Sequence, residues 1–373
     1  MSLKNEAQSA FQSTKSFYRE YVQGMNRERL GRELQADSER IKQLYDEAIG
    51  EGENQEKQQH LPFHIKVLRL FSALGQRLNP TRRLIFGISI ISFVAYSITN
   101  GLLADLLLLT AFGGLLMLLL VELLEKSDVK REIDLAREIQ LSLLPQAELM
   151  NETLDIYSFA NTAQEVGGDY VDNIETDEGL YVVIADVSGK GLSAALYMVR
   201  MQALVNLIIE KSKPTPKELF LQLNNYVKSG IKDKTFVTAC VAYFPREAEY
   251  FKIARAGQNA PLFYSKQKNV TKPLRYDGFA LGMTATDKMD SFLKERKIPF
   301  KPGDTVLLYT DGLTEARNQH NEEYGLERLS SLLDVYGSMD SKSITKKIQQ
   351  SVESFIEGRK PHDDVTFTVV HHR

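Results

Sequence analysis

The sequence has few of the residues that cross-link small domains through disulfides or bind soft metals. It contains one cysteine, six histidines and no tryptophan among 373 residues. One cysteine can form neither an internal disulfide nor a multi-thiolate metal site. Because free cysteines are usually buried and Cys240 lies in the apolar run 236–244, we expect a structural role for it. This composition is compatible with a reducing cytoplasm.

Excess charge of either sign is also scarce. The 46 Lys and Arg residues nearly balance 49 Asp and Glu residues, for a net charge of −3. This balance gives no electrostatic reason to expect nucleic-acid binding. The first forty residues are polar and charged, so we expect no signal peptide there.

One long apolar region stands out. Residues 84–98 are almost continuously apolar, Asn100-Gly101 follows, and residues 102–120 are apolar except for Asp105. Each arm is somewhat shorter than the roughly 20 residues of a spanning helix, and Asn-Gly is a natural turn. Basic residues flank both outer ends: Arg82, Arg83, Lys126 and Lys130. We therefore expect a transmembrane hairpin over 82–122 with both termini in the cytoplasm.

The alternative to a membrane hairpin is a buried helical hairpin of a soluble domain. The two arms lack the polar face that a soluble surface helix shows, which disfavours this alternative. Asp105 lies near the turn, where a carboxylate can sit at the far interface; at mid-bilayer it costs roughly 2.5–3.5 kcal/mol.

Helical spacing continues on both sides of the apolar region. Residues 28–49 place apolar residues close to helical spacing, and 51–60 form a polar break. Residues 64–78 are basic and amphipathic, typical of a helix that lies on a bilayer or packs on a neighbouring helix. We expect residues 1–81 to form a helical cytoplasmic region.

A heptad spacing follows the hairpin within residues 123–148. Its members are Val129, Ile133, Ala136, Gln140 and Leu143, and Leu144-Pro145 ends the helix. The segment is either an ordinary amphipathic connector or a short parallel coiled coil that joins two copies into a homodimer.

From residue 149 onward the pattern mixes strands and helices. We expect strands over 180–185, 236–244, 250–256, 305–309 and 365–370, and helices over 192–211, 324–336 and 341–358. A further helix begins at Thr215-Pro216, where Thr215 and Glu218 form a capping box. Hairpin-like strand pairs mixed with helix pairs favour an α+β fold over an alternating parallel sheet.

Four acidic motifs are spread through this mixed region. They are E-V-G-G-D-Y-V-D (165–172), A-D-V-S-G-K-G (185–191), Y-T-D-G-L-T-E-A (309–316) and H-D-D-V-T (362–366). Each alone is weak, because charged loop residues usually face solvent. S-G-K-G also fails the phosphate-loop pattern, since no hydroxyl follows Lys190.

Taken together the motifs predict a metal site. Asp186 and Asp311 follow apolar runs, and Asp363 and Asp364 open the last strand. If these strands lie in neighbouring sheets, their carboxylates converge and repel one another. A divalent cation resolves the repulsion, and oxygen ligands select Mg²⁺ or Mn²⁺ over zinc.

These motifs, in this order and together with F-V-T-A (236–239) and I-Q-L-S-L-L-P (139–145), closely resemble the metal-dependent protein phosphatases of the PPM superfamily. The match is to the bacterial branch that regulates stress response and sporulation, and it covers about residues 131–371. The resemblance implies a β-sandwich of two antiparallel sheets flanked by helix pairs, with two Mn²⁺ or Mg²⁺ ions at one edge.

The resemblance also implies roles for individual residues. Asp186 matches the carboxylate that bridges both metals, and Val187 a position that offers a backbone carbonyl. Asp169 matches an acid that binds one metal directly or through water. Asp311 and Asp363 match the acids of the other metal, and Asp364 a position with Asp or Asn. Asp186, Asp169 and Asp311 are the catalytic candidates.

The chain departs from the family pattern at three places. Gln258 replaces a usual histidine in A-G-Q-N-A-P (256–261), a loop that we expect to shape the domain. Ser188-Gly189-Lys190 follows the bridging aspartate where eukaryotic members have a histidine, so the proton donor is unassigned. No phosphate-gripping arginine can be assigned, and His362 is as well explained by a structural role.

Our leading hypothesis is a membrane-anchored, multi-pass serine/threonine phosphatase whose catalytic domain, residues 149–373, is cytoplasmic. The resemblance implies a phosphoprotein substrate such as an anti-sigma-factor antagonist. A catalytically silent phosphatase-fold binding module is the alternative, which the retained aspartates disfavour. A nucleotide cyclase is a third reading, because G-G-D-Y is similar to the G-G-D-E-F turn, but it leaves the last two motifs unexplained.

Overall fold

The fold is taken from a computed structural model, in which residues 34, 38–39, 63–230, 235–359 and 361–373 are described. The polar break at 51–60, and all but three residues of the helix expected over 28–49, lie outside this part of the chain. The chain divides into two compact units, residues 1–126 and 127–373.

Between residues 63 and 126, all of which are described, the first unit contains three helical segments. They are α4 (Phe63–Arg77), α5 (Pro80–Tyr96) and the first part of α6 (Leu102–Ser142). Proline stands at the first helical position of α5, where its missing N–H costs nothing. The turn between α5 and α6 contains Asn100-Gly101, as the sequence predicts. Helix α6 continues without a break into the second unit and ends before Pro145.

The second unit contains two antiparallel sheets. One sheet has six strands in the order β1-β2-β11-β10-β7-β8, and the other has five in the order β3-β4-β5-β6-β9. The strands of the first sheet are β1 (Glu148–Met150), β2 (Leu154–Asn161), β7 (Leu262–Ser265), β8 (Val270–Pro273), β10 (Thr305–Tyr309) and β11 (Val365–His372). Those of the second are β3 (Asp169–Glu175), β4 (Gly179–Val187), β5 (Val237–Pro245), β6 (Tyr250–Ala256) and β9 (Glu295–Pro299).

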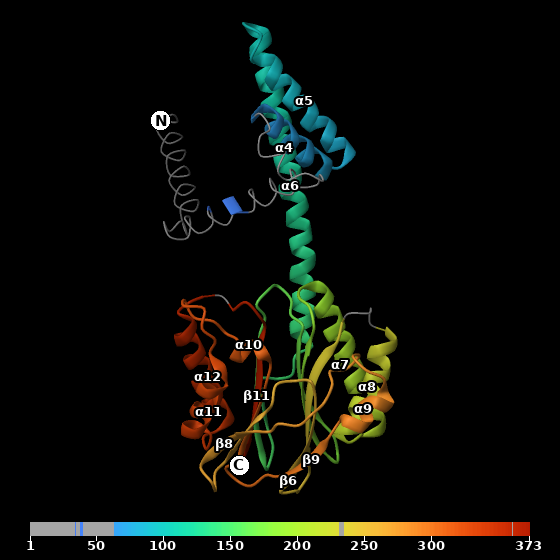
Figure 1. The fold of residues 1–373 in the computed structure, drawn as a ribbon, viewed down its shortest axis with the longest axis vertical. Helices are drawn as coiled ribbons and strands as arrows, with labels where there is room; N and C mark the ends of the chain where they lie inside the picture. The colour runs from blue at the N-terminus through green and yellow to red at the C-terminus, as the bar shows by residue number, and fades with distance from the viewer. Residues whose placement is uncertain (1–33, 35–37, 40–62, 231–234, 360) are drawn as a thin grey trace, which may run out of the picture. The chain divides into compact units, whose positions relative to one another are not determined.

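Helices cover the outer face of each sheet (Figure 1). Helices α7 (Leu192–Ser212), α8 (Pro216–Gly230) and α9 (Thr286–Phe292) lie on the five-stranded sheet. Helices α11 (Gly325–Tyr336) and α12 (Ser341–Ile356) lie on the six-stranded sheet. A short helix, α10 (Asp311–Thr314), follows β10. The expected α+β sandwich of two antiparallel sheets flanked by helices is confirmed.

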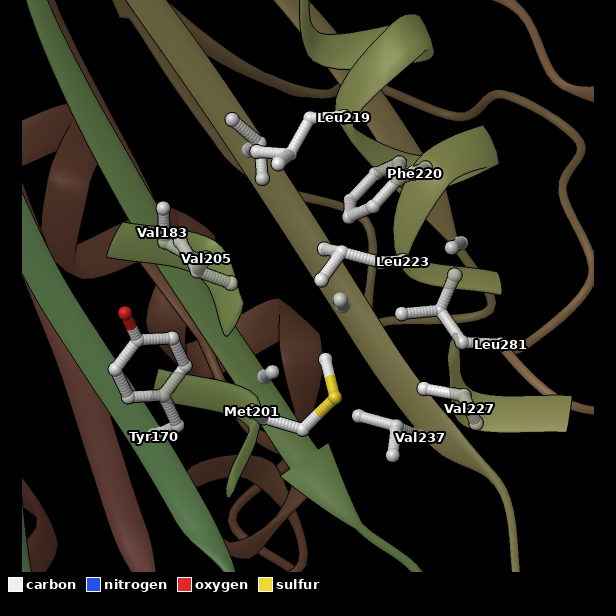
Figure 2. Close-up of a cluster of buried hydrophobic side chains, with 14 of the residues drawn as sticks. Tyr170, Val183, Met201, Val205, Leu219, Phe220, Leu223, Val227, Val237 and Leu281 are labelled. Carbon is white, nitrogen blue, oxygen red and sulfur yellow. The ribbon is translucent and has the colours of Figure 1, made fainter. Parts of the chain in front are cut away.

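Three hydrophobic layers hold these elements together. One fills the space between the sheets, and the other two lie between each sheet and its helices. Figure 2 shows the layer under α7 and α8, where Met201 and Val205 of α7 meet Leu223 of α8 above the strands. The single cysteine, Cys240, is buried between the sheets, as expected.

The strongest apolar runs predicted their elements well. Strands β6 and β10 match the expected ranges, and the capping box of α8 forms, with Thr215 N donating to Glu218 Oε2 at 2.9 Å. Strand β3 was not predicted, because Asp169, Asp172 and Asn173 interrupt its apolar pattern. Asp172 is buried as an acceptor for the Tyr170 hydroxyl and the Asn206 amide.

Truncating the core beneath α7 should destabilise the sandwich. Met201 is 3% exposed and Leu196, on the same helix, is 63% exposed. M201A leaves a cavity, so we expect its free energy of unfolding to fall by about 2–5 kcal/mol, whereas L196A should change it by less than about 0.5 kcal/mol. Urea denaturation followed by circular dichroism measures both, and equal losses would contradict the layer assignment.

Candidate active site

The site begins where two strands of the five-stranded sheet present carboxylates side by side. Asp169 opens β3, Asp186 lies near the end of β4, and the antiparallel register pairs the two residues directly. Apolar neighbours fix this placement, because residues 180–185 of β4 are all buried. Asp169 is itself buried, with 8% of its surface exposed.

The six-stranded sheet delivers its acids to the same place. Asp311 follows β10 at the start of α10, and Asp363 and Asp364 precede β11, the antiparallel partner of β10. The buried Thr310 hydroxyl donates to Asp169 Oδ2 at 2.8 Å and so joins the two sheets. We call the five residues Asp169, Asp186, Asp311, Asp363 and Asp364 the acidic edge.

Asp364 ties the loops around the acidic edge. Its Oδ1 accepts the Ala163 N–H at 2.8 Å and its Oδ2 accepts the Gly168 N–H at 2.8 Å. The backbone approaches this residue so closely that only glycine fits. A Cβ at Gly167 would lie 2.3 Å from Asp364 Oδ2, and one at Gly312 would lie 2.0 Å from the Asp364 carbonyl oxygen.

Asp363 has a cationic partner. Lys190 Nζ lies 2.8 Å from Asp363 Oδ2 and donates a second hydrogen bond, of 2.8 Å, to the His362 carbonyl oxygen. The other carboxylate oxygen of Asp363 accepts the Asp364 N–H at 3.0 Å. Lys190 therefore bridges the loop after β4 and the loop before β11.

The end of helix α6 contacts the first acidic motif. The Gln140 amide donates to the Gly167 carbonyl oxygen at 2.7 Å, and Gly167 N–H donates to Gln140 Oε1 at 3.0 Å. Gln140 is 5% exposed. This buried pair of hydrogen bonds fixes the Gly167-Gly168 turn, two residues before Asp169.

Crowding of the carboxylates disfavours their charged forms. Burial, followed by the charges of Asp311 and Asp363, raises the pKa of Asp186 to about 7. Burial and the neighbouring Asp186 raise the pKa of Asp169 well above its usual value, against the effect of the Thr366 and Thr310 hydroxyls. Burial also raises the pKa of Asp311 and of Asp364. The edge holds more negative charge than the protein alone offsets.

The structure places the five candidate aspartates and Val187 at this end of the strands. The Val187 carbonyl oxygen lies close to Gly168: a Cβ added to Gly168 would be 3.0 Å from it. Gln258 is buried nearby and donates to the Tyr309 carbonyl oxygen at 3.1 Å, which agrees with a shaping role for its loop. The roles of the individual aspartates as ligands remain predictions.

The donors fit a hard divalent cation by their chemistry. All are oxygens, and burial together with neighbouring carboxylates raises the pKa values of Asp169 and Asp186. Within the described residues, no three side chains of His, Cys, Asp and Glu are grouped as metal ligands. A magnesium site usually has one or two carboxylates and several waters, so this arrangement is compatible with one.

Three contributors to the site were missed by sequence reasoning. Thr310 follows β10 directly and precedes Asp311, so its position gave a usable signal. Gln140 was interpreted as a heptad position, whereas its side chain is buried on Gly167. Lys190 was considered only as part of a failed phosphate loop, and its contact with residue 363 is far away in the sequence.

Comparisons with known proteins agree with this geometry. The family described as "Stage II sporulation protein E (SpoIIE)" matches residues 176–373, more than half of the chain. Phosphoserine phosphatase RsbU of Bacillus subtilis is 28% identical over 247 residues, which are 66% of this chain and 71% of RsbU. Phosphoserine phosphatase RsbP of the same organism is 24% identical, over 66% of this chain and 59% of RsbP.

A solved structure shows the same fold. The SiaA-PP2C domain of Pseudomonas aeruginosa superposes with a TM-score of 0.57 at 17% identity, over 66% of this chain and 98% of that domain. The sandwich and its acidic edge thus define a PP2C-type protein serine/threonine phosphatase, a class that uses Mg²⁺ or Mn²⁺. The chain belongs to the SpoIIE family, in the bacterial regulatory branch of the PPM superfamily.

The raised pKa values predict a pH-dependent stability in chelator. Asp186 titrates near 7 in the folded chain and near 3.8 when unfolded, so the folded state binds the additional proton between these values. Stability from this group therefore falls as pH rises from about 4 to about 7. D186N removes the effect, so its melting temperature should exceed that of the wild type by more at pH 8 than at pH 5. Thermal melts at both pH values test this, and a smaller difference at pH 8 would contradict it.

Proposed function

We propose that the chain is a membrane-anchored phosphatase that hydrolyses phosphoserine or phosphothreonine on a regulatory protein, through a water activated at two Mn²⁺ or Mg²⁺ ions. The observation that carries this proposal is the acidic edge, to which both sheets deliver carboxylates. Burial raises the pKa values of Asp169, Asp186, Asp311 and Asp364 there. Segments 1–81, 82–122, 123–148 and 149–373 are the proposed domains.

Each residue of the edge has a proposed task. Asp186 is paired with Asp169 across β3 and β4, and the charges of Asp311 and Asp363 act on it, so it would serve both ions. Asp169 would bind one ion directly or through water, beside the Val187 carbonyl. Asp311 and Asp363 would hold the other ion. Asp364 fixes the Gly168 turn through two backbone N–H groups and contributes a further oxygen.

In the proposed reaction the protein forms no covalent bond to the substrate. When bound, divalent ions would lower the pKa of water and offset the charge that develops on the phosphoryl group. The water oxygen bonds to phosphorus as the ester bond to the serine or threonine oxygen breaks. Overall, the water loses one proton and the leaving oxygen gains one. The side chains of the edge orient these groups, and no protein nucleophile is used: Cys240 is buried, and burial raises its pKa to about 12.

The names of two relatives support a proposed substrate class. RsbU and RsbP are named phosphoserine phosphatases. We extend this to a phosphoprotein of a partner-switching pathway, such as an anti-sigma-factor antagonist, in stress-response signalling.

Packing in the first unit supports the membrane anchor. Small or polar residues are buried between α5 and α6, while Leu, Ile and Phe side chains face outward. Ser89 is 1% exposed, Ala111 is 2% exposed, and a Cβ at Gly114 would lie 2.1 Å from Ser89 Oγ. Close approach through small residues, with an apolar exterior, is typical of helices packed in lipid.

Two described helices are long and apolar enough to cross a membrane, α6 and α7. Only 6% of the apolar window of α6 is buried, against 39% for α7, whose Met198, Val205 and Ile209 lie in the core of the sandwich. Of the two, α6 is therefore the proposed span, with the 17-residue α5 as the other arm of the hairpin.

Fewer of the heptad positions are accessible to a partner helix than the sequence spacing predicts. Val129 is 52% exposed, and Ile133 and Ala136 are partly exposed. Gln140, in contrast, is buried and hydrogen-bonded to Gly167. A homodimer through α6 would use Val129, Ile133 and Ala136.

The activity is tested with an aryl phosphate. We expect Mn²⁺-dependent release of phosphate that EDTA abolishes, and D186N should lower turnover by roughly 100-fold or more, the scale of losing a main electrostatic stabiliser. D177N is the matched control, because Asp177 is exposed at the other end of β3 and β4. No turnover by the wild type, on the aryl phosphate and on a phosphoprotein mixture, would favour the silent binding module.

The anchor is tested by labelling N100C in intact cells. The hairpin places residue 100 on the outer side, so a membrane-impermeant maleimide should label it, while the buried Cys240 should not react. Labelling of N100C only after cells are opened would contradict the hairpin.

A further inference from the structure

Lys190 forms an ion pair with Asp363 of the acidic edge. Among the ion pairs formed by described residues, only that of Lys190 with Asp363 involves one of the five aspartates. Its charge also acts on Asp186 and Asp311, whose carboxyl pKa values it lowers against the larger effect of burial. Lys190 thus lies within electrostatic reach of three of the proposed ligands.

The geometry leaves Lys190 able to make one more contact. An ammonium group has three N–H donors. One is directed to Asp363 Oδ2 and one to the His362 carbonyl oxygen, each at 2.8 Å. No other acceptor within the described residues takes the third. The side chain is half exposed, at 50%, so the remaining donor is open to a group that arrives from solvent.

A phosphoryl group arriving at this edge meets mostly negative charge. A phosphate ester near neutral pH carries close to two negative charges, and the edge itself contributes five carboxylates. Lysine binds phosphate oxygens as a compact point charge. The two protein acceptors hold Nζ at the edge and restrict its rotation, so less side-chain entropy is lost when a phosphate oxygen binds.

We propose that Lys190 is a substrate-binding residue of this phosphatase: it donates its third N–H to a non-bridging phosphoryl oxygen, while Asp363 and the His362 carbonyl position the ammonium group. The proposal deepens the proposed function and rests on it. It supplies a phosphate-binding cation from the loop after β4, where the sequence offered no arginine for the task. No bond is made or broken by Lys190 in this role.

Binding of inorganic phosphate tests the role separately from turnover. The full chain and its variants are loaded with Mn²⁺, and calorimetry gives the dissociation constant of phosphate. Losing one charge-assisted hydrogen bond should raise this constant roughly tenfold or more in K190M. K190R keeps a cation and should recover most of the affinity. The KM for aryl phosphate and the inhibition constant of phosphate should rise in parallel, more than kcat falls.

K213M is the matched control. Lys213 ends the same helix, α7, that Lys190 precedes, and it pairs with Asp177 and Glu178. K213M should bind phosphate as the wild type does. A Mn²⁺ titration of each variant shows whether the metal is affected.

The outcomes are distinct. Unchanged phosphate affinity in K190M overturns the proposal, and so does a loss of phosphate binding that follows only from weaker Mn²⁺ binding. Tighter Mn²⁺ binding with unchanged phosphate affinity would make Lys190 a mere counter-ion of Asp363, which also overturns it. If the wild type binds phosphate through Lys190 but hydrolyses no ester, the proposed function fails and the phosphate contact stands.

Discussion

Repulsion between carboxylates at one edge of the sandwich is the constraint on which the rest of the site depends. Asp169 and Asp186 face each other across β3 and β4. The charges of Asp311 and Asp363 act on Asp186, and that of Asp364 acts on both residues. Such an arrangement is unfavourable unless the surrounding protein over-determines it. Three hydrophobic layers hold the strands in register, so the strand ends cannot move apart to relieve the repulsion.

Hydrogen bonds then position the aspartate side chains and loops that lie beyond the hydrophobic core. The Thr310 hydroxyl donates to Asp169 across the two sheets. Asp364 accepts the N–H of Ala163, just before the first acidic motif, and that of Gly168, within it. These contacts use uncharged donors, so they orient the carboxylates without cancelling the excess charge. The excess is what a hard cation requires, because its affinity grows with the number of charged oxygens around it.

The sequence predicted the parts of this arrangement that are local. Apolar runs located β6 and β10, and the four acidic motifs located all five aspartates of the edge. It did not predict β3, whose buried Asp172 accepts hydrogen bonds from Tyr170 and Asn206. It also did not predict the Lys190–Asp363 pair or the Gln140–Gly167 pair, because these join residues far apart in the sequence and depend on how the sheets stack.

Asp364 shows why proximity to a metal site does not define a residue's task. Both of its carboxylate oxygens accept backbone N–H groups, and its own carbonyl oxygen lies against Gly312. An asparagine here would keep one acceptor oxygen. Its NH₂ group would then face one of the two backbone N–H groups, of Ala163 or Gly168, that now donate to the carboxylate. In this chain the Asp364 carboxylate therefore holds the Gly168 turn, whether or not it also binds a cation. Asp364 thus joins the fourth acidic motif to the first through its side chain and to the third through its backbone, and the edge behaves as a single unit.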